Sequence, residues 1–338
     1  MHSSKVISIG EALIDRLGSP GENSFSSEFV KDCFGGAPAN VACALSRLGV
    51  NVSFIGSLGN DSFGKRFQNL MDQRGINTLG LQSDDLRPTR IVLVRRDNDG
   101  ERFFEGFQGD RGYGFADQAI FSSKIKEKWD LISKNAKWLI AGSIPLASEI
   151  SGEALLWTLE RAFDLRIQIA MDLNWRPTFW THQVSQDMTP SAKDRKKIRS
   201  IMKYVSLLKL AKEEAIWFFG SSNPREISSI FQQQPAVIVT DGPNPISWYL
   251  NKHQGITKAI LPTSVIDTTG AGDAFTAGVI YKLLSFNLNQ INFQMAKDII
   301  GFATACGAYV CQGVGAIDSQ PLKEDVEQLL SSYEGGIS

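Results

Sequence analysis

The chain has 338 residues, of which 43% are hydrophobic, and its formal net charge is −1. The nearly balanced charge provides no general attraction for nucleic acid or for an anionic membrane surface, and no apolar run approaches the roughly 18 residues that cross a bilayer. This composition predicts a soluble globular protein with an ample core and without nucleic-acid or membrane partners.

Four cysteines lie far apart in the sequence without CxxC spacing, namely Cys33, Cys43, Cys306 and Cys311. Cys43 and Cys306 fall within apolar helical patterns, so we expect reduced thiols in the core. The first strand-like residues follow Met1 to Lys5 directly, which leaves no room for a signal peptide. These features favour a cytoplasmic protein.

Strand-like and helix-like segments alternate along most of the chain. The strand candidates are Val6 to Ile9, Val52 to Ile55, Trp138 to Ala141, Ile167 to Met171, Ser206 to Leu210 and Ala236 to Thr240. The helix candidates between them are Phe63 to Arg74, Gly152 to Phe163, Arg195 to Met202, Glu213 to Phe219 and Pro224 to Phe231. Such alternation predicts an α/β fold, with a mostly parallel sheet covered by helices on both faces and ligands at the carboxyl ends of its strands.

Two pairs of strand-like segments lack helices of their own. Arg90 to Arg95 and Arg102 to Phe107 are joined by Asp97-Asn98-Asp99-Gly100, which has the composition of a hairpin turn. Leu13 to Leu17 and Phe25 to Lys31 form the second pair. These pairs are either ordinary surface hairpins or a lid that keeps water away from a reactive site.

A first glycine-rich turn opens a helix near the N-terminus. It reads Gly35-Gly36-Ala37-Pro38-Ala39-Asn40-Val41-Ala42, and the apolar spacing predicts a helix over Asn40 to Leu48. Gly49 stands where a C-terminal cap belongs. The apolar run that follows, Val52-Ser53-Phe54-Ile55-Gly56, predicts a buried strand.

A second glycine-rich turn, Asp267-Thr268-Thr269-Gly270-Ala271-Gly272-Asp273, opens a helix predicted over Ala274 to Leu284. Small residues let backbone N–H groups approach a ligand, and a helix N-terminus favours an anion. Asp273 in the first turn would repel that anion unless the carboxylate takes part in the chemistry, as a base does in phosphoryl transfer to a hydroxyl. The alternative is that Asp273 merely caps its helix and the glycines merely make a tight turn.

The two turns together resemble the paired signatures of the PfkB, or ribokinase-like, family of carbohydrate kinases. The resemblance runs from about Val6 to about Gly315, with Gly49 and Gly59 at the family's spacing after the first turn. Gly10-Glu11-Ala12-Leu13-Ile14-Asp15 and Asp172-Leu173-Asn174-Trp175-Arg176-Pro177 make the chain most similar to a fructokinase.

This resemblance implies a three-layer α/β sandwich with a small β-sheet lid over a sugar site. Residues 1–12, 35–88 and 117–338 would form the nucleotide- and sugar-binding core, and residues 13–34 and 89–116 the lid. Phe103, Phe104 and Phe107 would line the lid's inner face. The resemblance also leaves open a homodimer formed through the lid.

The implied reaction is ATP-dependent phosphorylation of a sugar primary hydroxyl, with D-fructose giving fructose 6-phosphate. Asp273 would be the catalytic base, ionised with an ordinary pKa of about 4. Gly270, Ala271, Gly272 and Asp273 would form the anion hole, and Arg176 and Mg²⁺ would share its charge. The alternatives are a 2-keto-3-deoxygluconate kinase or a ribokinase of the same family, and a non-catalytic binding protein on this fold.

The residues that the resemblance assigns to the sugar are Asp15, Gly35, Gly36, Asn40, Phe104, Asn174, Arg176 and Asp273. Carboxylate and amide groups suit sugar hydroxyls, because polar groups left unpaired in a closed site are costly. Asn40 is alternatively a helix N-cap, a role that is compatible with sugar binding. Arg176 is alternatively part of a surface salt bridge, although its position after a buried strand favours contact with an anion.

The nucleotide half carries fewer matches. The residues assigned to ATP are Thr240, Gly242, Gly270, Gly272, Ala303 and Gly307, and Pro245 stands where the family has a further glycine. Ala303 and Gly307 belong to a helix predicted over Met295 to Val310, whose small residues serve equally well for close packing.

For metals, the resemblance assigns Glu214 to Mg²⁺, and Asp267 and Thr269 to a monovalent cation such as K⁺. Ala211 replaces the asparagine that the family usually has three residues before the glutamate, so a water would fill its place. A Walker P-loop, a GxGxxG turn after the first strand and a histidine cluster do not occur, which argues against a P-loop NTPase, a nicotinamide dehydrogenase and a zinc site.

Overall fold

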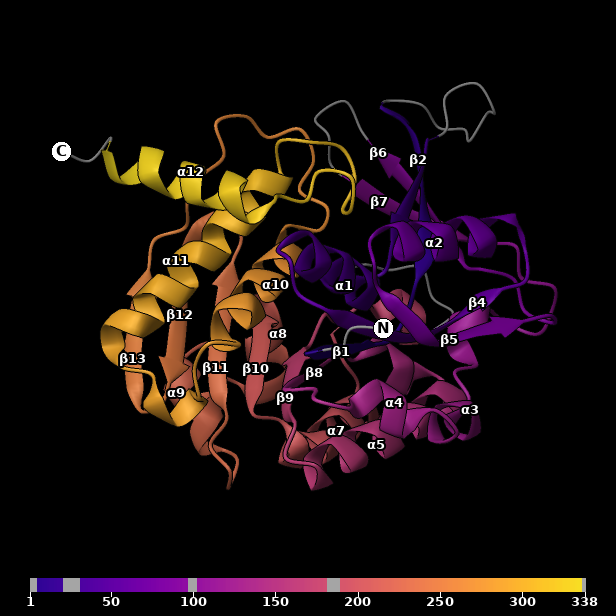
Figure 1. Ribbon diagram of the computed structural model, residues 1–338, viewed down its shortest axis with the longest axis horizontal. Coiled ribbons are helices and arrows are strands. Elements are labelled where there is room, and N and C mark those ends of the chain that lie inside the picture. The colour runs from indigo at the N-terminus through magenta and orange to yellow at the C-terminus, as the bar shows by residue number, and fades with distance from the viewer. Residues whose placement is uncertain (1–4, 21–30, 97–101, 181–188, 336–338) are drawn as a thin grey trace.

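The computed structural model describes residues 5–20, 31–96, 102–180 and 189–335. They form a nine-stranded sheet in the order β13-β12-β11-β10-β9-β8-β1-β4-β5 and a separate four-stranded sheet in the order β3-β2-β6-β7. In Figure 1 the small sheet projects from one upper corner of the molecule, away from the row of strands β13 to β8. The predicted α/β class with a small β lid is confirmed.

The nine strands of the large sheet are β1 (Val6–Ile9), β4 (Val52–Gly59), β5 (Asn77–Asp84), β8 (Trp138–Gly142), β9 (Gln168–Asp172), β10 (Leu207–Ala211), β11 (Ala236–Asp241), β12 (Asn244–Leu250) and β13 (His253–Thr257). Strands β5 through β11 in sheet order pair in parallel, and β12 and β13 add antiparallel pairs at one edge. The six predicted strands are confirmed, while β5, β12 and β13 were missed.

The twelve α-helices of the described residues are α1 (Ala37–Arg47), α2 (Ser62–Gln73), α3 (Ser122–Lys126), α4 (Trp129–Ser133), α5 (Glu149–Asp164), α6 (Pro177–Trp180), α7 (Ala192–Ile201), α8 (Lys212–Phe219), α9 (Pro224–Ser229), α10 (Ala271–Leu283), α11 (Phe293–Val310) and α12 (Lys323–Gly335). Every predicted helix is present, with ends that shift by a few residues, as helix ends commonly do. No helix within these described ranges is both long and apolar enough to cross a membrane.

Alternate residues of the central strands face opposite sides, because side chains alternate along a strand. On β1, Val6 packs into one apolar cluster and Ile7 into another, and both are fully buried. Helices α1, α10 and α11 cover the first face and lie in front of the strands in Figure 1. Helices α5, α7 and α8 contribute to the second cluster. The sheet is therefore buried on both faces, as its long apolar strands predict.

The small sheet, which we call the lid, consists of β2 (Leu13–Pro20), β3 (Lys31–Gly35), β6 (Ile91–Arg96) and β7 (Arg102–Gln108). Strands β6 and β7 pair antiparallel, as predicted, and β2 pairs with both β3 and β6. The predicted turn at 97–100 and residues 25–30 of the predicted second pair lie outside the described residues. The boundaries expected for core and lid stay a prediction.

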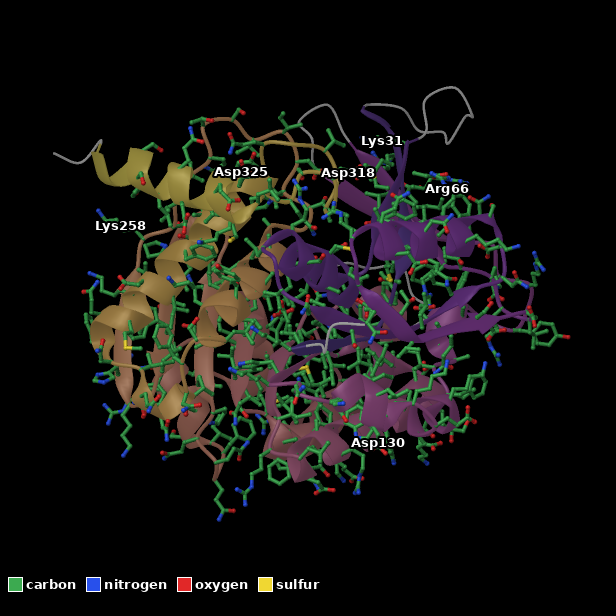
Figure 2. All side chains as sticks on the ribbon, in the orientation of Figure 1. Lys31, Arg66, Asp130, Lys258, Asp318 and Asp325 are labelled. Atoms are coloured by element: carbon green, nitrogen blue, oxygen red, sulfur yellow. The ribbon has the colours of Figure 1, made fainter. Side chains whose placement is uncertain are left out.

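Charged side chains such as Asp130, Lys258 and Arg66 are exposed and point outward from the edges of the molecule (Figure 2). All four cysteines are buried free thiols, as expected for reduced core residues. Burial raises the pKa of Cys43 to about 12, which keeps this thiol protonated and unreactive.

Candidate active site

The N-terminal turns of α1 and α10 meet above the carboxyl edge of the large sheet. Asn40 of α1 donates a hydrogen bond from Nδ2 to Oδ2 of Asp273 on α10, at 2.8 Å, across 233 positions of sequence. Strand β1 lies between β4 and β8 in the large sheet, so the later strands of the chain are added on both sides of β1. Ligands of open α/β sheets collect at such a switch point. The two glycine-rich turns predicted to cooperate are therefore adjacent in space.

The turn before α10 presents free backbone donors. Gly270 has a left-handed backbone (φ 79°), and its missing Cβ would otherwise lie 2.5 Å from the Ala316 side chain. Among the described residues, the backbone N–H groups of Gly272 and Asp273 have no protein acceptor, and Gly272 is exposed. The N–H of Ala271 instead donates to the Thr268 carbonyl oxygen at 3.2 Å. Of the N–H groups of Ala271, Gly272 and Asp273, which the resemblance makes the donors, the last two are thus available to an anion.

A buried ion pair that sequence reasoning missed supports this turn. Lys209, inside β10, donates from Nζ to both carboxylate oxygens of Asp172 at the end of β9, at 3.0 and 3.1 Å. Thr276 of α10 also donates to Asp172, at 2.8 Å. A Cβ on Gly272 would lie 3.3 Å from Lys209 Nζ, so the ammonium group lies directly beneath residues 270–273, which we call the anion-binding turn for its predicted role. A lysine within the apolar run 206–210 was the signal that could have identified this pair.

The electrostatics around Asp273 differ from the sequence expectation. Burial, and to a smaller extent the neighbouring Asp172 carboxylate, together raise the pKa of Asp273 to about 6. The hydrogen bond from Asn40 and the positive charges of Lys209 and Arg176 oppose that rise. The expected pKa of about 4 is therefore wrong. A pKa near 6 still leaves the carboxylate mostly ionised at neutral pH, and it makes the group a better base.

Asn174 and Arg176 follow β9 at the same edge of the sheet. Asn174 has a left-handed backbone (φ 45°), which turns the chain sharply after the strand. Arg176 is exposed, donates from Nη1 to the Trp175 carbonyl oxygen, and its charge lowers the pKa of Asp273. The structure thus brings Arg176 near the anion-binding turn, and no salt-bridge partner of this side chain appears within the described residues.

Glu214, assigned to Mg²⁺, bonds to the protein itself. Oε1 accepts the Trp175 N–H at 2.6 Å, and Oε2 accepts the Ala211 N–H at 2.7 Å. This carboxyl group therefore joins the loop after β9 to the start of α8. In the described part of the chain, no three His, Cys, Asp or Glu side chains cluster so that they could hold a metal. Each carboxylate oxygen of Glu214 thus already accepts one backbone N–H, and its assignment to Mg²⁺ stays a prediction.

Asp267 ties the anion-binding turn to the loop after α11. Its Oδ1 accepts from the N–H (2.9 Å) and the hydroxyl (2.7 Å) of Thr269, and its Oδ2 accepts from the Gly315 N–H at 2.9 Å. Gly315 in turn lies against lid strand β3, because a Cβ there would be 3.4 Å from Cys33 Sγ. The two residues assigned to a monovalent cation thus brace the turn.

On the sugar side, close approach explains two glycines of the first turn. A Cβ on Gly35 would lie 2.4 Å from Oδ2 of Asp15, so the glycine leaves room for that carboxylate. Gly36 has φ 100°, and a Cβ there would lie 2.5 Å from the Glu11 carbonyl oxygen. Asp15 therefore packs against Gly35, and Gly36 packs against the backbone of Glu11 and Ala12 at the turn that leads to Asn40.

An arginine that the sequence did not single out joins the lid to the core. Arg90, only 3% exposed, donates from Nε to both carboxylate oxygens of Asp117 at 3.0 and 3.1 Å. Asp117 lies in η1 (Ala116–Gln118). The guanidinium carbon lies 4.3 to 4.7 Å from the centroids of three phenyl rings, those of Phe107, Phe115 and Phe179.

Phe104, predicted to line the lid, is half-buried and packs edge-on against Phe107 at 4.9 Å. The side chain of Phe103 lies outside the described residues.

The residues assigned to the nucleotide divide into two groups. Thr240 and Gly242 lie at the carboxyl end of β11, where Gly242 has φ 55° and is exposed. Gly307 approaches the Ala271 carbonyl oxygen so closely that a Cβ would be 3.0 Å from it. Ala303 is fully buried against Gly278 of α10, so helix packing alone accounts for its small side chain, and its assignment to the nucleotide stays a prediction.

Comparison with known proteins gives a consistent result. The family model described as pfkB family carbohydrate kinase matches residues 3–323. The chain is 31% identical over 331 residues to the Arabidopsis thaliana protein named "Probable fructokinase-6, chloroplastic", covering 96% of this chain and 82% of that protein.

Two solved structures are similar along nearly the whole chain. The fructokinase from Xylella fastidiosa with bound ATP has a TM-score of 0.82 at 26% identity, with 98% of this chain and 99% of that chain covered. The fructokinase from Vibrio cholerae O395 with bound fructose, ADP and calcium ion has a TM-score of 0.78 at 25% identity, with 97% and 99% covered.

Proposed function

The chain belongs to the pfkB family of carbohydrate kinases, and on this premise we propose that it phosphorylates D-fructose with ATP to give fructose 6-phosphate. The fructokinase names of its relatives, and the fructose, ADP and ATP bound in the two similar structures, support this substrate pair. Within the molecule, the proposal depends on one observation. Asp273 lies beside free N–H donors at a helix N-terminus and receives a hydrogen bond from Asn40.

In the proposed reaction, each group of the site has a separate role. The sugar's primary hydroxyl attacks the γ-phosphorus of ATP in line, its proton passes to a carboxylate oxygen of Asp273, and ADP leaves with the electrons of the broken bond. The N–H groups of Gly272 and Asp273 hold the oxygen atoms on which charge accumulates. Arg176 adds positive charge on the same side. Asp15, Gly36 and Asn40 surround the space that we assign to the sugar.

Magnesium enters this proposal as part of the MgATP substrate. Mg²⁺ commonly binds substrate phosphates and several waters with few protein ligands, which suits a site where Glu214 already accepts two backbone N–H groups. When bound, the ion would neutralise charge on the phosphate oxygens. Activation by K⁺ at Asp267 and Thr269, a homodimer through the lid and a cytoplasmic location stay predictions.

An acceptor panel tests the proposal directly. Purified protein is incubated with ATP and either fructose, mannose, ribose, a nucleoside or 2-keto-3-deoxygluconate, and ADP release is followed with a coupled assay, with and without Mg²⁺ and K⁺. We expect fructose to give the highest kcat/KM, with a requirement for Mg²⁺ and with fructose 6-phosphate as the product identified by NMR. Preference for 2-keto-3-deoxygluconate or ribose would change the assigned substrate, and absence of ADP release with every acceptor would refute kinase activity.

A further inference from the structure

Two buried oxygen atoms beside Asp273 have no hydrogen-bond donor among the described residues. They are Oε2 of Glu11 and Oδ1 of Asn40, in side chains that are 2% and 3% exposed. Buried polar atoms in native proteins are nearly always paired, so each exception needs a physical explanation. Two such atoms adjacent to a catalytic carboxylate suggest a single shared cause.

Both side chains contact the first turn of α1, Asn40 as part of that turn and Glu11 from the segment after β1. Glu11 follows β1, and its Oε1 accepts the backbone N–H of Ala37 at 3.0 Å. Asn40 comes three residues after Ala37 and therefore lies on the same helix face. Helical side chains lean toward the N-terminus, so the Asn40 amide extends back over the turn that the Glu11 carboxyl group covers.

One additional proton would complete the hydrogen bonding of the Glu11 and Asn40 side chains. Oε2 of an ionised Glu11 and Oδ1 of Asn40 are both acceptors, so neither satisfies the other. A protonated Glu11 gains one O–H donor, which would satisfy both atoms at once. Nδ2 of Asn40 is already committed to Asp273, which fixes the amide's oxygen as the remaining acceptor.

The surroundings favour the protonated form. Burial raises the pKa of Glu11 to about 8 against the lowering effect of its own backbone N–H and that of Ala37. The negative charges of Asp117 in η1 and Asp273 in α10 contribute to that rise, and Arg90, directly before β6, is already engaged with Asp117. Glu11 therefore keeps its proton at neutral pH.

We propose that protonated Glu11 is a positioning residue that donates from Oε2 to Oδ1 of Asn40 and thereby holds Nδ2 of Asn40 toward Asp273. Without this donor the amide is free to turn over and to present its oxygen to the carboxylate, which removes the bond that keeps Asp273 ionised. The inference rests on the proposed function of Asp273 as the base. It gives a role to Glu11, a carboxylic acid that takes no part in the proposed phosphoryl transfer itself.

Two substitutions separate this role from a structural one. Glu11→Gln keeps an acceptor for the Ala37 N–H and supplies an amide donor to Asn40 that never ionises, whereas Glu11→Met has similar size and no donor. We expect Glu11→Gln to stay within about threefold of the wild-type kcat at pH 7, and Glu11→Met to fall about tenfold or more. The Glu11→Met profile should also show its acid limb shifted upward by about one pH unit, because the bond from Asn40 to Asp273 is weakened.

The alkaline side of the profile gives a second readout. With fructose and ATP saturating, wild-type kcat should fall as Glu11 ionises above about pH 8, and Glu11→Gln should lack that fall. Glu153→Gln, at an exposed glutamate bonded to Ser122, serves as the control and should retain the wild-type profile. Glu11→Gln as inactive as Glu11→Met, or Glu11→Met equal to wild type, would overturn the proposal.

Thermal melting of the ligand-free protein tests the protonation independently of catalysis. The pKa of Glu11 rises from 4.5 to about 8 on folding, so the folded state retains a proton that the unfolded chain releases. Wild-type Tm should therefore decline relative to that of Glu11→Gln as pH rises from about 5 to 8, and the difference should be constant above that. A Tm difference between wild type and Glu11→Gln that stays constant from about pH 5 to 8 would refute a protonated Glu11. This result does not depend on kinase activity, which the acceptor panel tests separately.

Discussion

The hydrogen bond between Asn40 and Asp273 predicts a measurable change in the pH dependence of turnover. Asn40→Leu removes the 2.8 Å bond at similar side-chain volume and supplies no replacement donor. Because the bond favours the ionised form, its loss must raise the pKa of Asp273 above about 6. A hydrogen bond to a charged group is worth about 1.5–3 kcal/mol, and one pKa unit corresponds to about 1.4 kcal/mol, so the expected rise is about one to two units.

The consequence is a loss of turnover at neutral pH that alkaline pH restores. With a pKa of about 6, roughly nine-tenths of Asp273 is ionised at pH 7, whereas pKa values of about 7 to 8 leave about one-half to one-tenth. The assay is kcat against pH at saturating fructose and MgATP, with fructose affinity measured separately by calorimetry, since Asn40 also borders the sugar space. An acid limb that remains near pH 6 in the variant would refute the assigned electrostatic role of Asn40.

Three further predictions concern the same site. Asp273→Asn should lower kcat by about 10²–10⁴ while fructose still binds, as checked by calorimetry, and near-normal turnover would exclude Asp273 as the base. Lys209→Met should reduce the free energy of unfolding in urea by about 3–5 kcal/mol, because Asp172 is left buried without its partner, and a loss below about 1 kcal/mol would contradict that pairing. Gly270→Ala should destabilise the protein by more than the about 1 kcal/mol expected of Gly220→Ala. Both glycines have a left-handed backbone, but a Cβ at Gly220 meets nothing within 4 Å, so equal losses would show that the crowding at Gly270 is unimportant.

The sequence predicted those parts of the site that follow from local backbone requirements. Tight turns, left-handed backbone and helix N-termini allow few residue types. For this reason Asp273, Asn40 and the glycines around them could be recognised from the sequence. The alternating apolar segments likewise predicted the central strands. Strands β12 and β13 were missed because β12 has fully buried residues only at alternate positions and the edge strand β13 has none, so neither contains the continuous apolar run of the central strands.

The residues that the sequence could not assign act through distant partners. Lys209 and Asp172 are 37 positions apart, and only the parallel pairing of β9 and β10 brings them together. The raised pKa of Asp273 depends on that same assembly, so the ordinary value expected from the residue type was wrong. The role of Ala303 could not be decided from the sequence, since small residues suit a ligand slot and a close helix contact equally well, and only the structure shows that it packs against Gly278.

The bracing of the anion-binding turn by Asp267 has a mechanical consequence. From the lid strand inward, Cys33 rests on Gly315, the amide of Gly315 holds Asp267, and Asp267 holds Thr269 immediately before the phosphate cradle. The lid strand β3 and the turn that we propose receives the phosphate therefore share a single support. Under the proposed function, a displacement of β3 by the sugar would therefore act on the turn at the nucleotide without any change in the large sheet.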